Sequence, residues 1–182
     1  MNTKQRILWI TRTAIFIALL VVAQGFSKPL GQYVTGSLVN LVLILSVLLG
    51  GLASGVTVAA LSPVFAFFLG IGPALVPVIP FVMLGNIALV VVWHFIAGKA
   101  TRVLPQYLVA LVVAALAKFL VLYLGVVVLV VGVLLNLPQQ QAAVLSATFS
   151  FPQLITAGIG GAVASLIVPI VKKALRQTRA AM

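Results

Sequence analysis

Long apolar runs, separated by short polar or Gly/Pro-rich segments, make up nearly the whole chain. Most of them are long enough to cross a membrane as helices, since a spanning helix needs about 20 apolar residues. The pattern predicts six helices, over residues 7–26, 37–49, 52–69, 81–97, 104–135 and 142–171. The first run follows two basic residues and could also be a signal peptide, but its length and the equally apolar remainder favour a retained helix. The expected fold class is all-α, a polytopic six-helix membrane bundle.

The connections between these helices are rich in residues that break helices. Residues 27–36 are expected to form a loop, and Gly50 and Gly51 a tight turn. Residues 70–80 contain three prolines and two glycines, which do not fit a regular helix, although the segment is apolar. Irregular backbone at membrane depth is tolerated only where it is buried in protein or lines a cavity. We therefore expect this segment to fold back over the outer face of the bundle.

Composition supports the membrane assignment and excludes a soluble domain. The 182 residues are 64% hydrophobic and 6% charged, against about 45–50% and about 25% in soluble domains. Six spans with their loops use the available length, so residues 1–182 are predicted to be a single transmembrane domain.

The residue types that are missing exclude several kinds of chemistry. The chain has no Asp, Glu or Cys and one His, which excludes paired-carboxylate catalysis and argues against a protein-built metal site. It also has no phosphate-binding loop, so it is expected to be no enzyme, to need no cofactor and to leave ATP hydrolysis to other chains. The net charge of +11 is spread over short loops and ends, which does not indicate nucleic-acid binding.

The distribution of basic residues predicts the orientation in the bilayer. Six spans place both termini on one side, and nine of the eleven Lys and Arg residues then share that side. Because cytoplasmic loops carry the excess of basic residues, both termini are expected to be cytoplasmic. Of the other two, Lys28 falls in the first outer loop and Lys118 near the middle of the fifth helix.

Polar side chains within the spans gather in the predicted outer half. Polar groups are costly inside a bilayer, so their depth is informative. The candidate substrate-binding residues are Tyr33, Asn40, Asn86, Tyr123 and Gln153. The alternative is that the amides only hydrogen-bond neighbouring helices together. The set predicts a pocket that opens outward, with residues 28–35 and 70–80 closing over it.

Lys118 has no acidic residue anywhere in the chain with which to pair. Its ammonium could be held by backbone carbonyls, lose its proton, or contact a ligand or partner. The alternative is that the side chain snorkels along its helix toward an interface.

Two alanines one helical turn apart mark the first helix. Ala14 and Ala18 share a face, where small side chains let another helix approach closely. This spacing is common in apolar helices, so it is also compatible with packing inside this chain.

The whole chain resembles the S component, the substrate-binding membrane subunit, of energy-coupling factor (ECF) vitamin transporters. The resemblance rests on size, six spans, a basic start leading into residues 13–18, and the patches 36–40, 61–63, 70–73 and 84–86. It implies that a multi-pass protein of the prokaryotic cell membrane captures a vitamin from outside. It also implies a transmembrane T subunit, which docks on Ala14 and Ala18, and two cytoplasmic ATPases that power toppling of the S component.

The vitamin itself is a further prediction. Asn, Gln and Tyr side chains suit a neutral ligand with many amides, which makes the cobalamin-specific branch the first choice. Pyridoxine, pantothenate and folate stay open as substrates. A small standalone facilitator and a scaffold protein are the alternatives from other functional classes.

Overall fold

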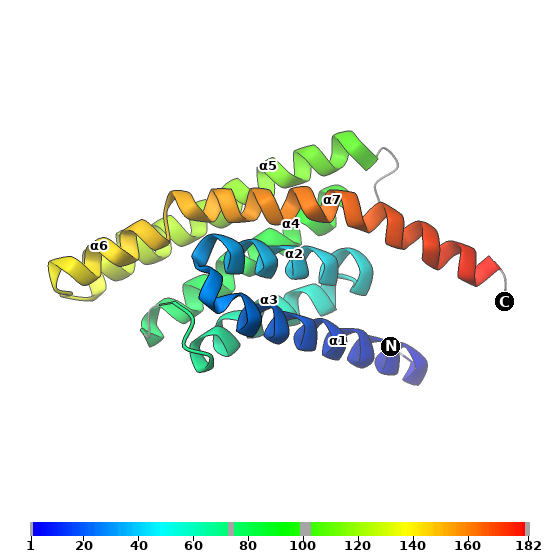
Figure 1. The fold of residues 1–182 in the computed structure, drawn as a ribbon, viewed down its shortest axis with the longest axis horizontal. Coiled ribbons are helices and arrows are strands. Elements are labelled where there is room, and N and C mark those ends of the chain that lie inside the picture. Colours follow the sequence, from blue (N-terminus) through cyan, green and yellow to red (C-terminus); the bar gives the residue numbers. More distant parts are fainter. Residues whose placement is uncertain (1, 73–74, 99–102, 181–182) are drawn as a thin grey trace.

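The chain folds as a bundle of long helices, seen in a computed structural model that describes residues 2–72, 75–98 and 103–180 (Figure 1). Those residues contain no strand. The α-helices are α1 (Thr3–Ser27), α2 (Gln32–Gly50), α3 (Leu52–Phe68), α4 (Ile79–Ala97), α5 (Val103–Leu122), α6 (Gln139–Thr148) and α7 (Phe151–Ala180). The remaining elements are the 3-10 turns η1 (Lys28–Leu30) and η2 (Val76–Val78) and the π-helix η3 (Tyr123–Leu134).

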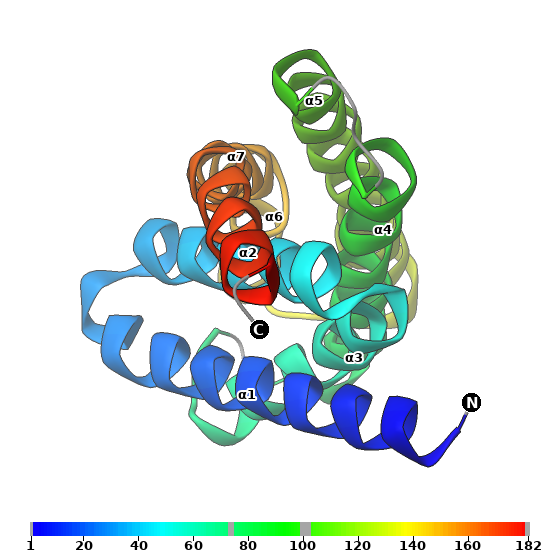
Figure 2. The same cartoon turned by 90° about the vertical axis from the view of Figure 1, so that its right-hand side faces the viewer.

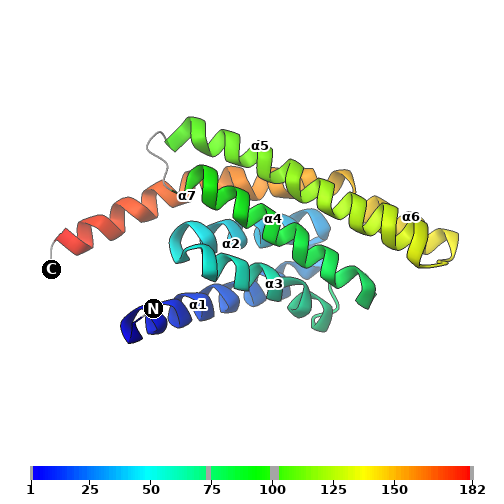
Figure 3. The ribbon, with the colours of Figure 1, turned by 180° about the vertical axis from the view of Figure 1, so that it is seen from behind.

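The lengths and composition of the helices confirm an all-α polytopic membrane fold. Five helical segments of the described residues are long and apolar enough to cross a bilayer, and α3, with 17 residues, is a shorter apolar helix. The chain runs back and forth along the bundle, so both termini lie at the same end (Figures 1 and 3). The connection between α1 and α2, the end of α3, the start of α4 and α6 lie at the opposite end (Figure 1).

Helix α2 is the centre of the bundle. It packs against α1, α3, α4 and α7, and the end-on view shows it between α1 and α7 (Figure 2). Close approach to α7 depends on glycine, because a Cβ at Gly160 would lie 2.7 Å from the Ser37 carbonyl oxygen. The core around α2 is apolar and fully buried, and includes Leu43, Ile44 and Trp93.

Several predicted helix boundaries were wrong. The expected loop over residues 27–36 is mostly helical, because Gly31, at φ +85°, reverses the chain within one residue and α2 starts at Gln32. The expected last helix is broken at Phe149 and Ser150 into α6 and α7, just before Pro152, which lacks a backbone N–H and suits the start of a new helix. The tail predicted after residue 171 continues α7 to Ala180. Pro73, in the predicted outer segment, and Lys99 and Arg102, two of the nine basic residues assigned to the terminal side, lie outside the described residues.

Candidate functional site

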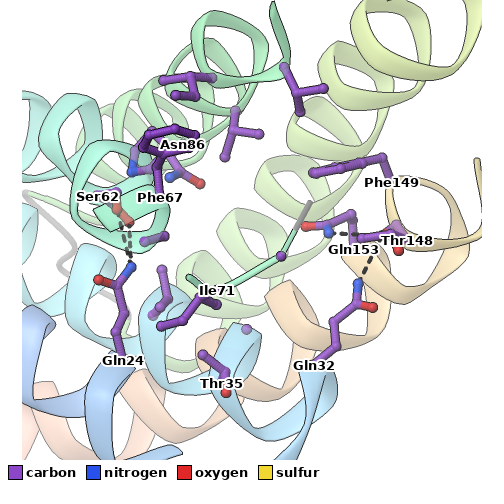
Figure 4. Close-up of a pocket in the computed structure, with 18 of the residues that line it drawn as sticks. Gln24, Gln32, Thr35, Ser62, Phe67, Ile71, Asn86, Thr148, Phe149 and Gln153 are labelled. Atoms are coloured by element: carbon purple, nitrogen blue, oxygen red, sulfur yellow. Dashed lines mark hydrogen bonds between the residues drawn. The ribbon is translucent and has the colours of Figure 1, made fainter. Parts of the chain in front are cut away.

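A cavity of about 610 Å³ opens at the end of the bundle opposite the termini. Each of the seven α-helices contributes at least one lining residue, and so do residues 70–72 of the segment between α3 and η2. Figure 4 shows how side chains from these elements converge on it. The volume lies within the ~300–1,000 Å³ that is usual for small-molecule sites.

The base of the cavity holds a buried lysine. Lys118 on α5 is 4% exposed and lines the cavity. Its Nζ donates to Asn40 Oδ1 at 2.6 Å and to Asn86 Oδ1 at 2.8 Å. An ammonium carries three donors, so these two amides leave one N–H available.

The orientation of the Asn40 amide is fixed by a second bond. Its Nδ2 donates to Thr156 Oγ1 on α7 at 3.2 Å, and Thr156 Oγ1 donates in turn to the Gln153 carbonyl oxygen at 3.3 Å. With the amide nitrogen engaged by a hydroxyl, the amide oxygen must face Lys118. The network thus makes Lys118 the donor, and connects α2, α4, α5 and α7 at the cavity base.

The rim is held by side chains that donate to backbone carbonyls. Gln32 Nε2 and Gln153 Nε2 both donate to the Thr148 carbonyl oxygen, at 2.9 Å and 3.0 Å (Figure 4). Across the opening, Lys28 Nζ donates to the Leu69 carbonyl oxygen at 2.8 Å. These bonds tie α2 to the α6–α7 break and η1 to the end of α3, so the irregular segments are fixed around the mouth.

The wall between base and rim is mostly apolar, with one amide pair. Phe67, Ile71 and Phe149 contribute hydrophobic surface (Figure 4). Gln24 Nε2 donates to the Ser62 carbonyl oxygen at 3.2 Å, while Gln24 Oε1 is buried with no hydrogen-bond partner among the described residues. The site therefore offers apolar contact along its sides and directed polar groups at its two ends.

Comparison with known proteins identifies the chain. Residues 9–172 match the family described as ECF transporter, substrate-specific component. The chain belongs to this family of S components. No curated protein and no solved structure is significantly similar to it. Membership confirms the predicted recognition and a substrate-binding role, and it implies a transmembrane T subunit and ATPase partners.

The structure brings together three of the five residues that were predicted to bind substrate in this S component. Asn40, Asn86 and Gln153 line the cavity. Tyr33 and Tyr123 are not among the lining residues; both are exposed, and the Tyr123 ring stacks on Phe119. Depth along a helix was predicted well, but the direction in which a side chain points around the helix was not.

Several lining residues were not among the predicted substrate-binding residues. Lys118 was singled out, with ligand contact as one possibility, and it does not snorkel, because it is buried at the cavity base. Gln24 and Gln32 were not considered as site residues. Gln24 interrupts an otherwise apolar run, and that signal would have identified it. Gln32 was covered only by the prediction that residues 28–35 close over the pocket, because its segment looks like an ordinary polar loop.

The alanine pair of the S component faces outward. Ala14 and Ala18 are exposed, as are Ile15 and Leu19 beside them. The opposite face of α1 packs inward, where Thr13 Oγ1 shares a 2.8 Å hydrogen bond with Ser54 Oγ of α3. The alanines therefore do not serve packing within this chain, and their face is available to lipid or to another helix.

Proposed function

We propose that this S component binds a vitamin-sized substrate in the cavity and delivers it across the membrane with a T subunit and two ATPases. The observation that carries the proposal is the cavity itself. It has the volume of a small-molecule site, polar groups at both ends, and irregular segments bonded around its mouth. Irregular backbone of this kind is tolerated at membrane depth where it lines a cavity.

The charge distribution supports capture from outside the cell. The termini lie at the end opposite the cavity (Figure 1), and nine of the eleven basic residues belong to segments assigned to the terminal side. Under the positive-inside rule that side is cytoplasmic. We propose that the protein resides in the prokaryotic cell membrane with its cavity toward the exterior.

The exposed alanine face supports docking of the T subunit on α1. Small side chains at the exposed Ala14 and Ala18, beside the bulkier Ile15 and Leu19, let a partner helix approach closely. Movement of the loaded S component against such a helix, with ATP hydrolysis in the partner ATPases, is the proposed route inward. The absence of acidic residues lowers the cost of exposing this bundle to hydrocarbon while it moves.

Cobalamin, the substrate expected from the sequence, stays a prediction. The cavity volume of about 610 Å³ is that of a site for a drug-sized ligand, and a corrinoid is much larger than such a ligand. The volume therefore favours the smaller alternatives, pyridoxine, pantothenate or folate.

A standalone facilitator is disfavoured by the core beneath the cavity. A channel needs a polar path across the whole bilayer. Fully buried apolar side chains, among them Leu43, Ile44 and Trp93, pack between the helices of the bundle instead. A scaffold role does not account for a cavity with a buried lysine at its base.

Purification from cells that express all four subunits tests the proposal. A tag on this chain is expected to recover a T subunit and both ATPases, together with a bound small molecule that mass spectrometry identifies. Recovery of the chain alone, with no small molecule and no uptake of labelled vitamins into cells, would contradict the proposal.

A further inference from the structure

We propose that the substrate of this S component carries a carboxylate that binds at the cavity base, against Lys118 and the side-chain amide of Asn86. The inference rests on the proposed function and adds the chemical class of the ligand. It also replaces the neutral ligand expected from the sequence with an anion.

The first argument is charge. Lys118 is 4% exposed, and a buried cation is costly unless it is paired. The whole sequence contains no Asp or Glu, so the chain itself has no side-chain carboxylate that could act as its counter-ion. The two amide oxygens at 2.6 Å and 2.8 Å solvate the ammonium but do not neutralise it. A counter-ion for the ammonium would therefore have to come from another molecule, and the cavity is where a small one can reach Lys118.

The second argument is the set of donors left over. Lys118 keeps one N–H beyond its two bonds to the asparagines. Asn86 Oδ1 is occupied by Lys118, while its Nδ2 has no acceptor among the described residues. Asn86 also lines the cavity. The base thus presents an ammonium N–H and an amide N–H side by side, and a carboxylate has two oxygens to accept them.

The third argument selects carboxylate over phosphate. One buried cation balances one negative charge, whereas a phosphate monoester carries about −1.5 to −2 at neutral pH. The other lysine of the cavity, Lys28, is an exposed rim residue bonded to the Leu69 carbonyl oxygen. It adds positive potential at the entrance, which attracts an anion, but does not face the base.

The rim indicates what the other end of the ligand carries. Gln32 and Gln153 use their amide nitrogens on the Thr148 carbonyl oxygen, so their amide oxygens stay available as acceptors. A ligand that fits both ends has a carboxylate at one end and hydroxyl or N–H donors at the other. Apolar contact with Phe67 and Phe149 accommodates the carbon skeleton between them.

Affinity selection from a complex mixture tests the inference without assuming a vitamin. The wild-type protein, purified in detergent, is incubated with yeast extract and washed, and the retained compound is identified by mass spectrometry. We expect a carboxylic acid. Its primary amide, made chemically, should bind about 10- to 150-fold more weakly, the range for losing a hydrogen bond to a charged group.

A retained compound without a carboxylate, or an amide that binds as well as the acid, would overturn the inference and leave the proposed function standing. If the wild type retains nothing, the proposed function fails and this inference fails with it.

A near-isosteric variant separates ligand binding from a purely structural role of Lys118. Asn86→Asp places a carboxylate at the position of the amide oxygen 2.8 Å from Nζ, where it pairs with the ammonium and repels an anionic ligand. We expect the preference for acid over amide to disappear, as it should in Lys118→Met, while Lys118→Arg keeps part of it.

An acid-to-amide affinity ratio that is unchanged in Asn86→Asp would show that Lys118 only connects helices. Because Asn86→Asp changes a single group, it remains informative if Lys118→Met does not fold. Asn136→Asp, an exposed change outside the cavity, is the matched control.

Discussion

The hydrogen bonds of Lys118 and its partners hold several helices together. Through Asn40, Asn86 and Thr156, the residue joins α2, α4, α5 and α7 at a single point. The polar groups meet there because each lies at a similar depth on its own helix. The same contacts that hold the helices also leave one face of the cluster open to the cavity.

Replacement of Asn86 by leucine should weaken substrate binding. Loss of one partner of a buried hydrogen bond costs about 1–3 kcal/mol, or roughly five- to 150-fold in affinity. Isothermal titration of the detergent-solubilised variant with the identified substrate measures the change, and recovery of the T subunit checks that the fold is intact. Asn136→Leu, an exposed asparagine outside the cavity, should bind like wild type. Equal affinities for all three proteins would mean that Asn86 only connects helices.

The sequence carries enough information to place polar residues by depth, and Asn40, Asn86 and Gln153 do line one cavity. It does not say which way a side chain points around its helix, since the apolar residues surround each helix on all sides and leave no polar stripe as a reference. Tyr33 and Tyr123 are exposed and are not among the residues that line the cavity. The Lys118–asparagine contacts depend on how four helices pack, which no local pattern encodes.

At the scale of helices, the contact between α2 and α7 depends on a missing side chain. A Cβ at Gly160 would lie 2.7 Å from the Ser37 carbonyl oxygen and 2.8 Å from Asn40 Cβ, whereas one at Gly158 would meet nothing within 4 Å. Gly160→Ala should therefore destabilise the protein by about 1–3 kcal/mol through overpacking, and Gly158→Ala should not. Thermal unfolding in the same detergent compares the two. A Gly160→Ala protein as stable as Gly158→Ala would show that the helices can separate at no cost.

Helix α1 should couple transport to the partner subunits through its outward face. Ala14→Trp or Ala18→Trp places a bulky ring where a partner helix is proposed to dock, on the exposed face of α1, whereas the cavity residue Gln24 lies on its buried face. Uptake of substrate into cells should fall while binding by the isolated subunit stays unchanged. Ala162→Trp, an exposed alanine on α7, serves as the control and should transport normally. A parallel loss of binding and uptake in the Ala14 and Ala18 variants would contradict the docking assignment.

Which segments are helical was largely predictable, but where they end was not. Apolar runs of spanning length predicted the bundle, since hydrophobic length is the dominant constraint on a membrane helix. Boundaries depend on single backbone conformations instead. Gly31 at positive φ starts α2 earlier than its polar neighbours suggested, and the turn at Phe149 and Ser150 divides a run that reads as continuous.

For the whole molecule, the orientation in the membrane can be checked directly. The chain has no cysteine, so single cysteines can be introduced on a clean background. Asn2→Cys and Ala180→Cys are expected to be shielded from a membrane-impermeant thiol reagent in intact cells, because the basic segments keep the termini inside. Gln140→Cys, exposed at the opposite end, should label. The reverse pattern would invert the topology and place the cavity on the cytoplasmic side.

The hydrogen bonds around the cavity mouth indicate which positions need a particular side chain and which can be substituted. Gln32 and Gln153 reach the carbonyl of Thr148, and Lys28 reaches that of Leu69. Every residue type has a backbone carbonyl, so the acceptor is kept after any substitution that leaves the backbone conformation unchanged. Each donor, in contrast, is a group of one particular side chain. Selection should therefore act on positions 28, 32 and 153 and tolerate change at 69 and 148. Descendants of this protein could replace the lining at Thr148, and so acquire a new ligand, while the mouth stays tied in the same way.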